Sequence, residues 1–499
     1  MEAIEGYTIK SYGFSIQVKI MGLKNRATNY ELSIPKFSVP TLALLDSIKT
    51  GIVTKITLSS SEILDPKSID KIKEKFMTAV SLMLKEEVPN IDESTKNVLI
   101  GRLMNEMVGL GDIEFLLLDE GLEEIVVNSS QEPVRVYHKR YGWLITNVVI
   151  DSEAKINNYS EIIARRVGRQ ITSLDPLLDA HLVTGDRANA VLYPISSKGN
   201  TITIRKFARD PWTVTDLIKN KTATSQLFAL IWLAMQYEMN IIISGGTASG
   251  KTSFLNVCMP FIPLNHRILS IEDTRELLLP KFLYWAPLVT RLPNPEGKGE
   301  VSMLDLLINS LRMRPDRIIL GEIRRQRDAE VLFEAMHTGH SVYATLHADS
   351  VAETISRLIN PPINVPSNLL EAVHLNVVMF RDRRRGIRRL YQVGEFLVTE
   401  EQGVNVVRPN IIYRWKPATD EIIKHSESVK FFDSLGRHTG MSQQEINQDL
   451  KEKIKILDFM VKHSIRKIDA VGKVMREFYL NKDNLIKLMN KGNVKEILR

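Results

Sequence analysis

The sequence is poor in the features that mark proteins of oxidising compartments. Its only cysteine is Cys258, which excludes an intramolecular disulfide and a cysteine-based zinc site. A chain without disulfides is typical of a reducing, intracellular compartment. Residues 1–5 carry acidic side chains and lack the basic-then-apolar order of a secretory signal.

Long apolar runs are also missing. No stretch reaches the roughly 20 apolar residues that a membrane-spanning helix needs. The nearest, residues 227–235, is followed by Gln236, Glu238 and Asn240 and is interpreted as a buried helix. If the protein works at a membrane, a partner must therefore recruit it there.

The composition is otherwise that of a globular protein with several domains. The 499 residues are too many for one core, so about two to four domains are expected. Hydrophobic residues make up 44% of the chain and charged residues 25%, which allows sizeable cores. The net charge of +7 is compatible with nucleic acid, anionic lipid or an acidic protein partner, and it selects none of them.

Hydrophobic periodicity divides the chain into four segments. Residues 1–110 begin with short strand-like runs and become helical from about residue 65. Residues 111–210 alternate short strands and helices, as an α+β domain does, and end at a candidate hinge at residues 210–212. The first of these segments is expected to carry partner specificity.

From residue 211 to about 400, strands and helices alternate. Runs such as 241–243 and 318–320 are wholly apolar, which is the pattern of strands covered on both faces. This pattern predicts an α/β domain built on a parallel sheet. Residues 401–499 are expected to be mainly helical, with Ser442 and Glu445 forming a capping box.

Residues 245–252 match the phosphate-binding Walker A pattern in full, with an apolar strand before the loop and a helix expected after it. Glycines allow a tight turn whose N–H groups point at phosphate oxygens. Lys251 would place its ammonium on the β and γ phosphates, and the Thr252 hydroxyl would ligate Mg²⁺. The predicted nucleotide-binding residues are Gly245, Gly246, Thr247, Ala248, Ser249, Gly250, Lys251, Thr252 and Ser253.

Acidic residues follow two apolar strands downstream of the loop. Glu272 and Asp273 end the first strand, and Glu322 follows the second. Ligands of open α/β sheets bind at the carboxyl ends of strands, so both sets can face a nucleotide. ATP hydrolysis needs a carboxylate that orients water and often a second that supports the metal. Solvated acids at strand ends are the alternative interpretation.

Two histidines, His340 and His347, flank another predicted strand. A zinc site is an alternative interpretation, but no cysteine lies nearby and the spacing is not that of a helical pair. We favour His347 as a sensor of the γ-phosphate over a purely structural histidine.

The order of these motifs resembles the type II/type IV secretion ATPase superfamily. Walker A is followed by an acidic box at 271–273, a Walker B-like segment at 311–324 and a histidine box at 338–349. Residues 247–252, 271–274 and 361–366 look most like the archaeal branch, with its pilus-assembly ATPases and archaellum motor ATPase. The resemblance is dense from about residue 111 to residue 395 and thin before it.

This resemblance implies a RecA-like P-loop ATPase domain with a smaller α+β N-terminal domain and helical extensions at both ends. It also implies a homo-hexamer that uses ATP and Mg²⁺. Glu322 would be the catalytic glutamate, and Thr252, Glu272 and Glu322 would hold the metal and its water. Arg187 and Arg205 match family arginines placed on the phosphates, where an arginine finger can raise the rate by roughly 10³ or more. A surface or ion-paired arginine is the alternative for each.

A basic run at residues 381–389 is interpreted as a solvated hairpin with Gly386 at the bend. The more specific alternative is that this run contacts a neighbouring subunit or an acidic loop of a membrane partner. No interleaved aromatic residues support base stacking, which disfavours nucleic acid. The tetracysteine zinc loop of many bacterial relatives is missing, so a platform contact through such a loop is excluded.

Together these features predict an ATPase motor for assembly of a type IV pilus-like filament or for secretion. We expect it in the cytoplasm, peripheral at the inner face of the cytoplasmic membrane, against a polytopic membrane platform protein. The archaellum motor and a conjugation ATPase are close alternatives. The motif order disfavours a nucleic-acid translocase, and the presence of Glu272 and Glu322 disfavours a nucleotide-binding protein without turnover.

Overall fold

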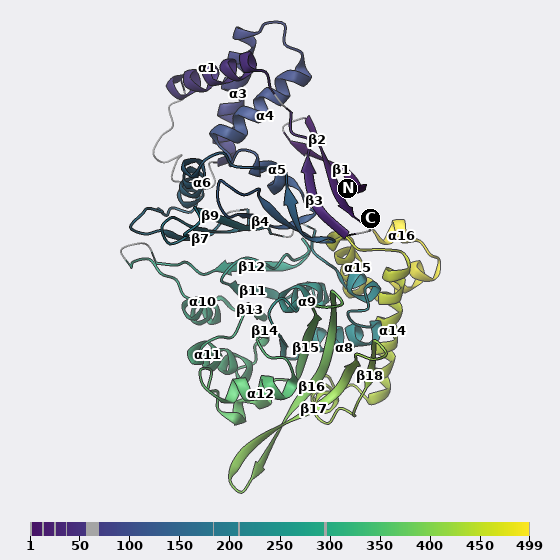
Figure 1. Cartoon of the computed structure of the whole chain (residues 1–499). Coiled ribbons are helices and arrows are strands. Elements are labelled where there is room, and N and C mark those ends of the chain that lie inside the picture. Colours follow the sequence, from purple (N-terminus) through teal and green to yellow (C-terminus); the bar gives the residue numbers. More distant parts are fainter. Residues whose placement is uncertain are drawn as a thin grey trace. The chain divides into compact units, whose positions relative to one another are not determined.

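Two sheets organise the chain, each within its own unit, residues 1–209 and residues 210–499 (Figure 1). The computed structural model describes residues 2–11, 14–23, 26–35, 37–55, 69–182, 184–207, 210–293 and 297–498. The helix expected from about residue 65 begins its described part at Ile69, so its predicted start lies outside these ranges.

The first unit is built on an antiparallel sheet with one parallel pair. Among the described residues the strand order is β1-β2-β3-β6-β5-β4-β9-β8-β7, and only β3 and β6 run parallel. The strands are β1 (Glu2–Ser11), β2 (Phe14–Leu23), β3 (Arg26–Leu32), β4 (Leu122–Val127), β5 (Arg135–His138), β6 (Gly142–Thr146), β7 (Leu177–His181), β8 (Arg187–Val191) and β9 (Thr201–Arg205). The alternation predicted for residues 201–205 is confirmed, because Ile202 and Ile204 are buried while their neighbours are not.

The parallel pair joins the beginning of the chain to residues more than a hundred positions later. Tyr30 pairs with Thr146, and the Tyr30 and Tyr7 hydroxyls both donate to Asp119 Oδ2 at 2.6 Å. Strands expected in segment 1–110 and strands expected in segment 111–210 therefore share one sheet. The division of the chain into four segments stays a prediction.

Helices of the first unit form a second, smaller core. Leu45, Val80, Leu84, Leu103 and Met104 are buried together between α1, α3 and α4. The helices are α1 (Val39–Lys55), α3 (Ile69–Glu87), α4 (Glu93–Met107), α5 (Ile113–Leu118) and α6 (Glu153–Arg166).

The second unit contains a mixed sheet in the order β12-β11-β13-β14-β10-β15-β16-β17-β18. Pairing is parallel from β12 to β15 and antiparallel from β15 to β18. The strands are β10 (Ile241–Gly245), β11 (Arg267–Glu272), β12 (Tyr284–Val289), β13 (Arg317–Leu320), β14 (Ser341–Leu346), β15 (Leu375–Asp382), β16 (Ile387–Glu401), β17 (Val404–Lys416) and β18 (Glu421–Lys424). The predicted parallel sheet is thus present, and the hairpin predicted at Gly386 begins an antiparallel extension whose further strands, β17 and β18, were not expected.

Helices cover both faces of this sheet, which explains its uninterrupted apolar strands (Figure 1). Ile241 and Ile243 face a core with α8, α9, α14 and α15, whereas Ile242 faces α10, α11 and α12. The helices are α7 (Val214–Lys219), α8 (Ser225–Gln236), α9 (Lys251–Cys258), α10 (Met303–Ser310), α11 (Gln326–His337), α12 (Val351–Ile359), α13 (Phe431–Thr439), α14 (Gln443–Lys462), α15 (Ile468–Asn490) and α16 (Val494–Ile497), with 3₁₀ turns at Met259–Phe261, Leu311–Met313 and Ser367–Ala372.

The predicted fold class is confirmed: an α/β unit, a smaller α+β unit and a helical C-terminal region. The stretch 227–235 lies in the buried helix α8, and the capping box of Ser442 and Glu445 begins α14. Residues 404–424, expected in the mainly helical segment, instead form β17 and β18, and helices begin at Phe431. Within the described residues, no helix combines the length and apolar character required to span a bilayer.

A buried carboxylate fastens the antiparallel extension to the first C-terminal helix. Glu395 of β16 is fully buried and accepts hydrogen bonds from the backbone N–H groups of Phe431 (2.7 Å) and Val429 (3.0 Å) and from Asn410 Nδ2 (3.0 Å). The start of α13 therefore depends on one side chain.

We predict that Glu395→Leu lowers the free energy of unfolding by roughly 2–4 kcal/mol, because it leaves several buried donors without an acceptor. Glu395→Gln keeps one acceptor oxygen and should cost less. Urea denaturation measures both, and Glu400→Leu at an exposed position of the same strand is the control. Equal losses at residues 395 and 400 would contradict the anchoring role.

Candidate functional site

The loop between β10 and α9 has the backbone that its glycines predict. Gly245, Ala248 and Gly250 have φ values of +153°, +60° and +93°. A Cβ atom at Gly245 would lie 2.5 Å from the backbone oxygen of Met379 in the neighbouring strand β15, so no larger residue fits there. Gly250 caps the start of α9, whose free N–H groups make a natural anion site.

The predicted nucleotide-binding residues lie together in this turn. Thr247, Ala248 and Ser253 are exposed, and Thr252 is half-buried. Ser249 is buried, and its Oγ has no hydrogen-bond partner in the described part of the chain. A buried hydroxyl without a partner inside a loop of this kind fits an anionic ligand that would supply one.

Lys251 is held inside the loop. Its side chain is buried, and Nζ donates to the backbone oxygens of Gly245 (2.8 Å) and Gly246 (3.0 Å) and lies 3.3 Å from His347 Nδ1. Burial lowers the pKa of Lys251, and the charges of Glu322 and Asp349 oppose that shift. These contacts hold the Lys251 ammonium within the loop.

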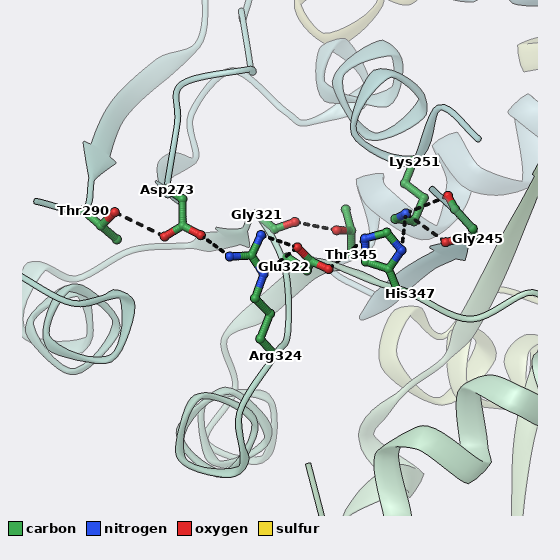
Figure 2. A network of polar contacts seen from close by, with 10 residues as sticks. Gly245, Lys251, Asp273, Thr290, Gly321, Glu322, Arg324, Thr345 and His347 are labelled. Carbon is green, nitrogen blue, oxygen red and sulfur yellow. Dashed lines mark hydrogen bonds and ion pairs between the residues drawn. The ribbon is translucent and has the colours of Figure 1, made fainter. Parts of the chain in front are cut away.

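A chain of polar contacts leads from Lys251 along the edge of the sheet (Figure 2). His347 Nε2 lies 3.0 Å from Glu322 Oε1, and Arg324 Nε donates to Glu322 Oε2 at 2.7 Å. Arg324 Nη1 also contacts Asp273 Oδ2 at 2.6 Å. Burial and the nearby Lys251 charge lower the pKa of His347, so its ring is neutral near neutral pH.

Parallel pairing explains why these side chains meet. The strands β11, β13, β14 and β10 are consecutive neighbours, and their carboxyl ends share one edge. Gly321 N donates to the oxygen of Ile271 at 2.8 Å, and Ile323 N to that of Thr345 at 2.9 Å. The backbone after β13 is thereby fixed between its two neighbours, which places Glu322 between them.

Glu272 lies at the same edge in a different environment. It is almost fully buried, and its Oε1 accepts from the N–H groups of Glu276 (2.9 Å) and Leu277 (3.1 Å). Its Oε2 is buried without a hydrogen-bond partner among the residues described. Burial raises the pKa of Glu272 to about 7. A partnerless carboxylate oxygen is a suitable ligand for hydrated Mg²⁺, to which Thr252 and Glu322 could contribute.

The histidines occupy opposite ends of β14. His347 follows its carboxyl end and joins the chain of contacts, whereas His340 precedes its start and lies 3.3 Å from the backbone oxygen of Ala335 through Nδ1. Only His347 belongs to the site.

The two predicted arginines lie in the first unit, whereas the residues of this cluster belong to the second. Arg187 of β8 and Arg205 of β9 are cross-strand partners. Arg187 forms a two-bond ion pair with Asp179, at 3.0 Å through Nε and 2.6 Å through Nη2. Arg205 is exposed at the end of its strand.

Two further residues that contact this cluster were given no role from the sequence. Arg324 lies two positions after Glu322, and that position near a strand end was the available signal. The hairpin of β15 and β16, predicted with Gly386 at its bend, supplies the second, Arg388. Its Nε donates to the backbone oxygen of Ala248 at 3.2 Å, and no local pattern indicates this contact.

The sequence is similar to those of several known proteins. Residues 171–402 match the model of a family described as type II/IV secretion system protein. An uncharacterized protein of Methanocaldococcus jannaschii, MJ0900, is 35% identical over 385 residues, covering 76% of this chain and 69% of the relative. The chain belongs to the type II/IV secretion system protein family.

Two further proteins are also similar to this chain. The type IV secretion system protein PtlH of Bordetella pertussis is 30% identical over 299 residues, covering 54% of this chain and 87% of PtlH. The crystal structure of the pilus retraction motor PilT with bound ADP aligns at 16% identity and a TM-score of 0.42, covering 74% of this chain and 92% of PilT.

We predict that Glu272 makes the stability of this secretion-system protein depend on pH. The pKa of Glu272 rises from 4.5 to about 7 on folding. Between these values the folded chain keeps a proton that the unfolded chain releases, so stability falls as pH rises, by up to roughly 3 kcal/mol.

Urea unfolding at pH 5 and pH 8, in EDTA, tests this dependence. Glu272→Gln removes the titrating group, so its stability relative to the wild type should be greater at pH 8 than at pH 5. A difference between the two proteins that does not change with pH would contradict the prediction.

Proposed function

We propose that the protein is an Mg²⁺-dependent ATPase that works as a homo-hexameric motor for assembly of a type IV pilus-like filament or for secretion. The observation that carries the proposal is the continuous contact from Lys251 in the phosphate loop through His347 to Glu322. It puts a cation for phosphate, a neutral imidazole and a carboxylate in one line at the loop.

Each side chain has a role in that reaction. Backbone N–H groups of the loop and Lys251 bind the β and γ phosphates, which keeps the terminal phosphoryl group in place. Glu322 orients the attacking water and accepts its proton, and neutral His347 reports whether the γ-phosphate is present. Mg²⁺, when bound, neutralises charge on the phosphates, and Thr252, Glu272 and Glu322 would hold it and its water.

Family relatives support a role in a membrane-associated machine. PtlH is named a type IV secretion system protein, and a Mycobacterium tuberculosis relative, 29% identical, is named a putative conjugal transfer protein. We propose a polytopic membrane platform protein as partner, with the motor peripheral at the inner face of the cytoplasmic membrane. A conjugation ATPase and the archaellum motor are the alternatives, and nucleic acid is not a proposed partner.

We predict that Glu322→Gln abolishes most turnover, by about 10² or more in kcat, while nucleotide binding and the oligomeric mass persist. The amide keeps the shape of the carboxylate but cannot accept the proton of water. Steady-state Mg²⁺-ATPase assays, nucleotide titration and mass measurement with and without ATP test this.

Glu334→Gln, at an exposed position of α11, is the control that should keep wild-type turnover. Undiminished turnover in Glu322→Gln would remove Glu322 from the role of catalytic glutamate and direct attention to Glu272. A wild-type protein that stays monomeric and silent with ATP, Mg²⁺ and lipid would contradict the motor itself.

Arg187 and Arg205 are proposed to supply charge to the phosphates, either within their own subunit or from a neighbouring one. Arg205 is exposed, whereas Arg187 is held by Asp179, so Arg205→Ala should lose more kcat than Arg187→Ala. Mixing Arg205→Ala with Glu322→Gln tests action between subunits, because some interfaces then pair an intact arginine with an intact glutamate. Recovered turnover in the mixture supports this action, and a mixture as inactive as its components contradicts it.

A further inference from the structure

The carboxylate of Glu322 is already engaged on both oxygens. Oε2 receives two guanidinium nitrogens of Arg324, Nε at 2.7 Å and Nη2 at 2.6 Å, and Oε1 faces His347 Nε2 at 3.0 Å. A carboxylate offers about four lone-pair directions, and three are used here. Little capacity is left on this carboxylate to orient a water molecule.

Arg324 holds a second acid at the same time. Its Nη1 contacts Asp273 Oδ2 at 2.6 Å, and the other oxygen of Asp273 accepts a hydrogen bond from Thr290 Oγ1 at 3.2 Å (Figure 2). Asp273 is therefore fixed from its far side, while 58% of the Arg324 side chain is exposed. The guanidinium has room to move and two carboxylates that compete for it.

The competing acids belong to different strands. Asp273 directly follows β11 and Glu322 follows β13, so the guanidinium spans the ends of two neighbouring parallel strands. Arg324 itself lies between Ile323, which is fixed to β14, and the start of α11. A shift of this short segment changes how Arg324 is shared between the acids.

Building on the proposed ATPase function, we propose that Arg324 is a positioning residue that restrains Glu322, and that Asp273 is the competing partner that frees Glu322 for water. When Arg324 moves fully onto Asp273, both lone pairs of Glu322 Oε2 become available. The balance between the two ion pairs then sets how much of the protein is ready to hydrolyse ATP.

Substitutions of Arg324 and of Asp273, the two ends of one ion pair, should change kcat in opposite directions. Arg324→Gln removes the restraint and should raise basal kcat about threefold or more with little change in KM. Asp273→Asn removes the competitor, leaves Arg324 on Glu322, and should lower kcat by a similar factor. The double variant should behave like Arg324→Gln alone, because Asp273 acts only through Arg324.

Steady-state ATPase kinetics of the full-length protein measure kcat and KM for all three variants. Arg327→Gln, at an exposed position in the first turn of α11, is the charge-matched control. Arg324→Lys keeps the charge but loses the two-bond geometry, so it should lie between wild type and Arg324→Gln. Thermal unfolding shows whether any variant has lost its fold.

Loss of turnover in folded Arg324→Gln would overturn the inference and would assign Arg324 an activating or structural role. A rise in kcat for Asp273→Asn, or additive effects in the double variant, would also overturn it. Glu322→Gln distinguishes failure of the proposed function from failure of the restraint. Turnover that persists in Glu322→Gln contradicts the proposed role of Glu322. Loss of turnover in Glu322→Gln, together with unchanged kinetics of Arg324→Gln, contradicts only the restraint by Arg324.

Discussion

Parallel hydrogen bonding between β11, β13, β14 and β10 is the constraint on which the site depends. It brings four strand ends to one edge, although the residues that follow them are separated by up to about a hundred positions. Lys251, Glu272, Glu322 and His347 each lie within a few residues of such an end. Lys251, His347 and Glu322 are in contact because β10, β14 and β13 are neighbours in this order.

The scaffold is rigid because both faces of these strands are covered. Residues 241–243 alternate between two apolar cores, so a slip of one residue would exchange side chains between the cores and disrupt the close packing of both. Flexibility is left to the exposed polar groups at the strand ends. Arg324 shows the contrast, because its backbone neighbour Ile323 is buried while its own side chain is largely exposed.

Local sequence signals predicted the parts of the structure that depend on neighbours in the chain. The phosphate loop, the apolar strands, the hairpin at Gly386 and the capping box of Ser442 were all readable because their geometry follows from adjacent residues. The pairing of β3 with β6 and the antiparallel strands β17 and β18 were not, because strand partners far apart leave no local pattern. For the same reason Arg388 at Ala248 and Arg324 between two acids emerged only from the structure.

The charged side chains in the contact chain around Glu322 balance one another. Lys251 and Arg324 are balanced by Glu322 and Asp273, and neutral His347 adds no charge. Asp349 and Glu276 add negative charge close enough to act on Lys251. In the proposed function a multiply charged anion therefore finds no surplus of cations within the chain of contacts, and Mg²⁺, the loop N–H groups and the exposed arginines of the β15–β16 hairpin would balance its charge. Because exposed charges are screened by salt, ionic strength becomes a control on how readily the loop is filled.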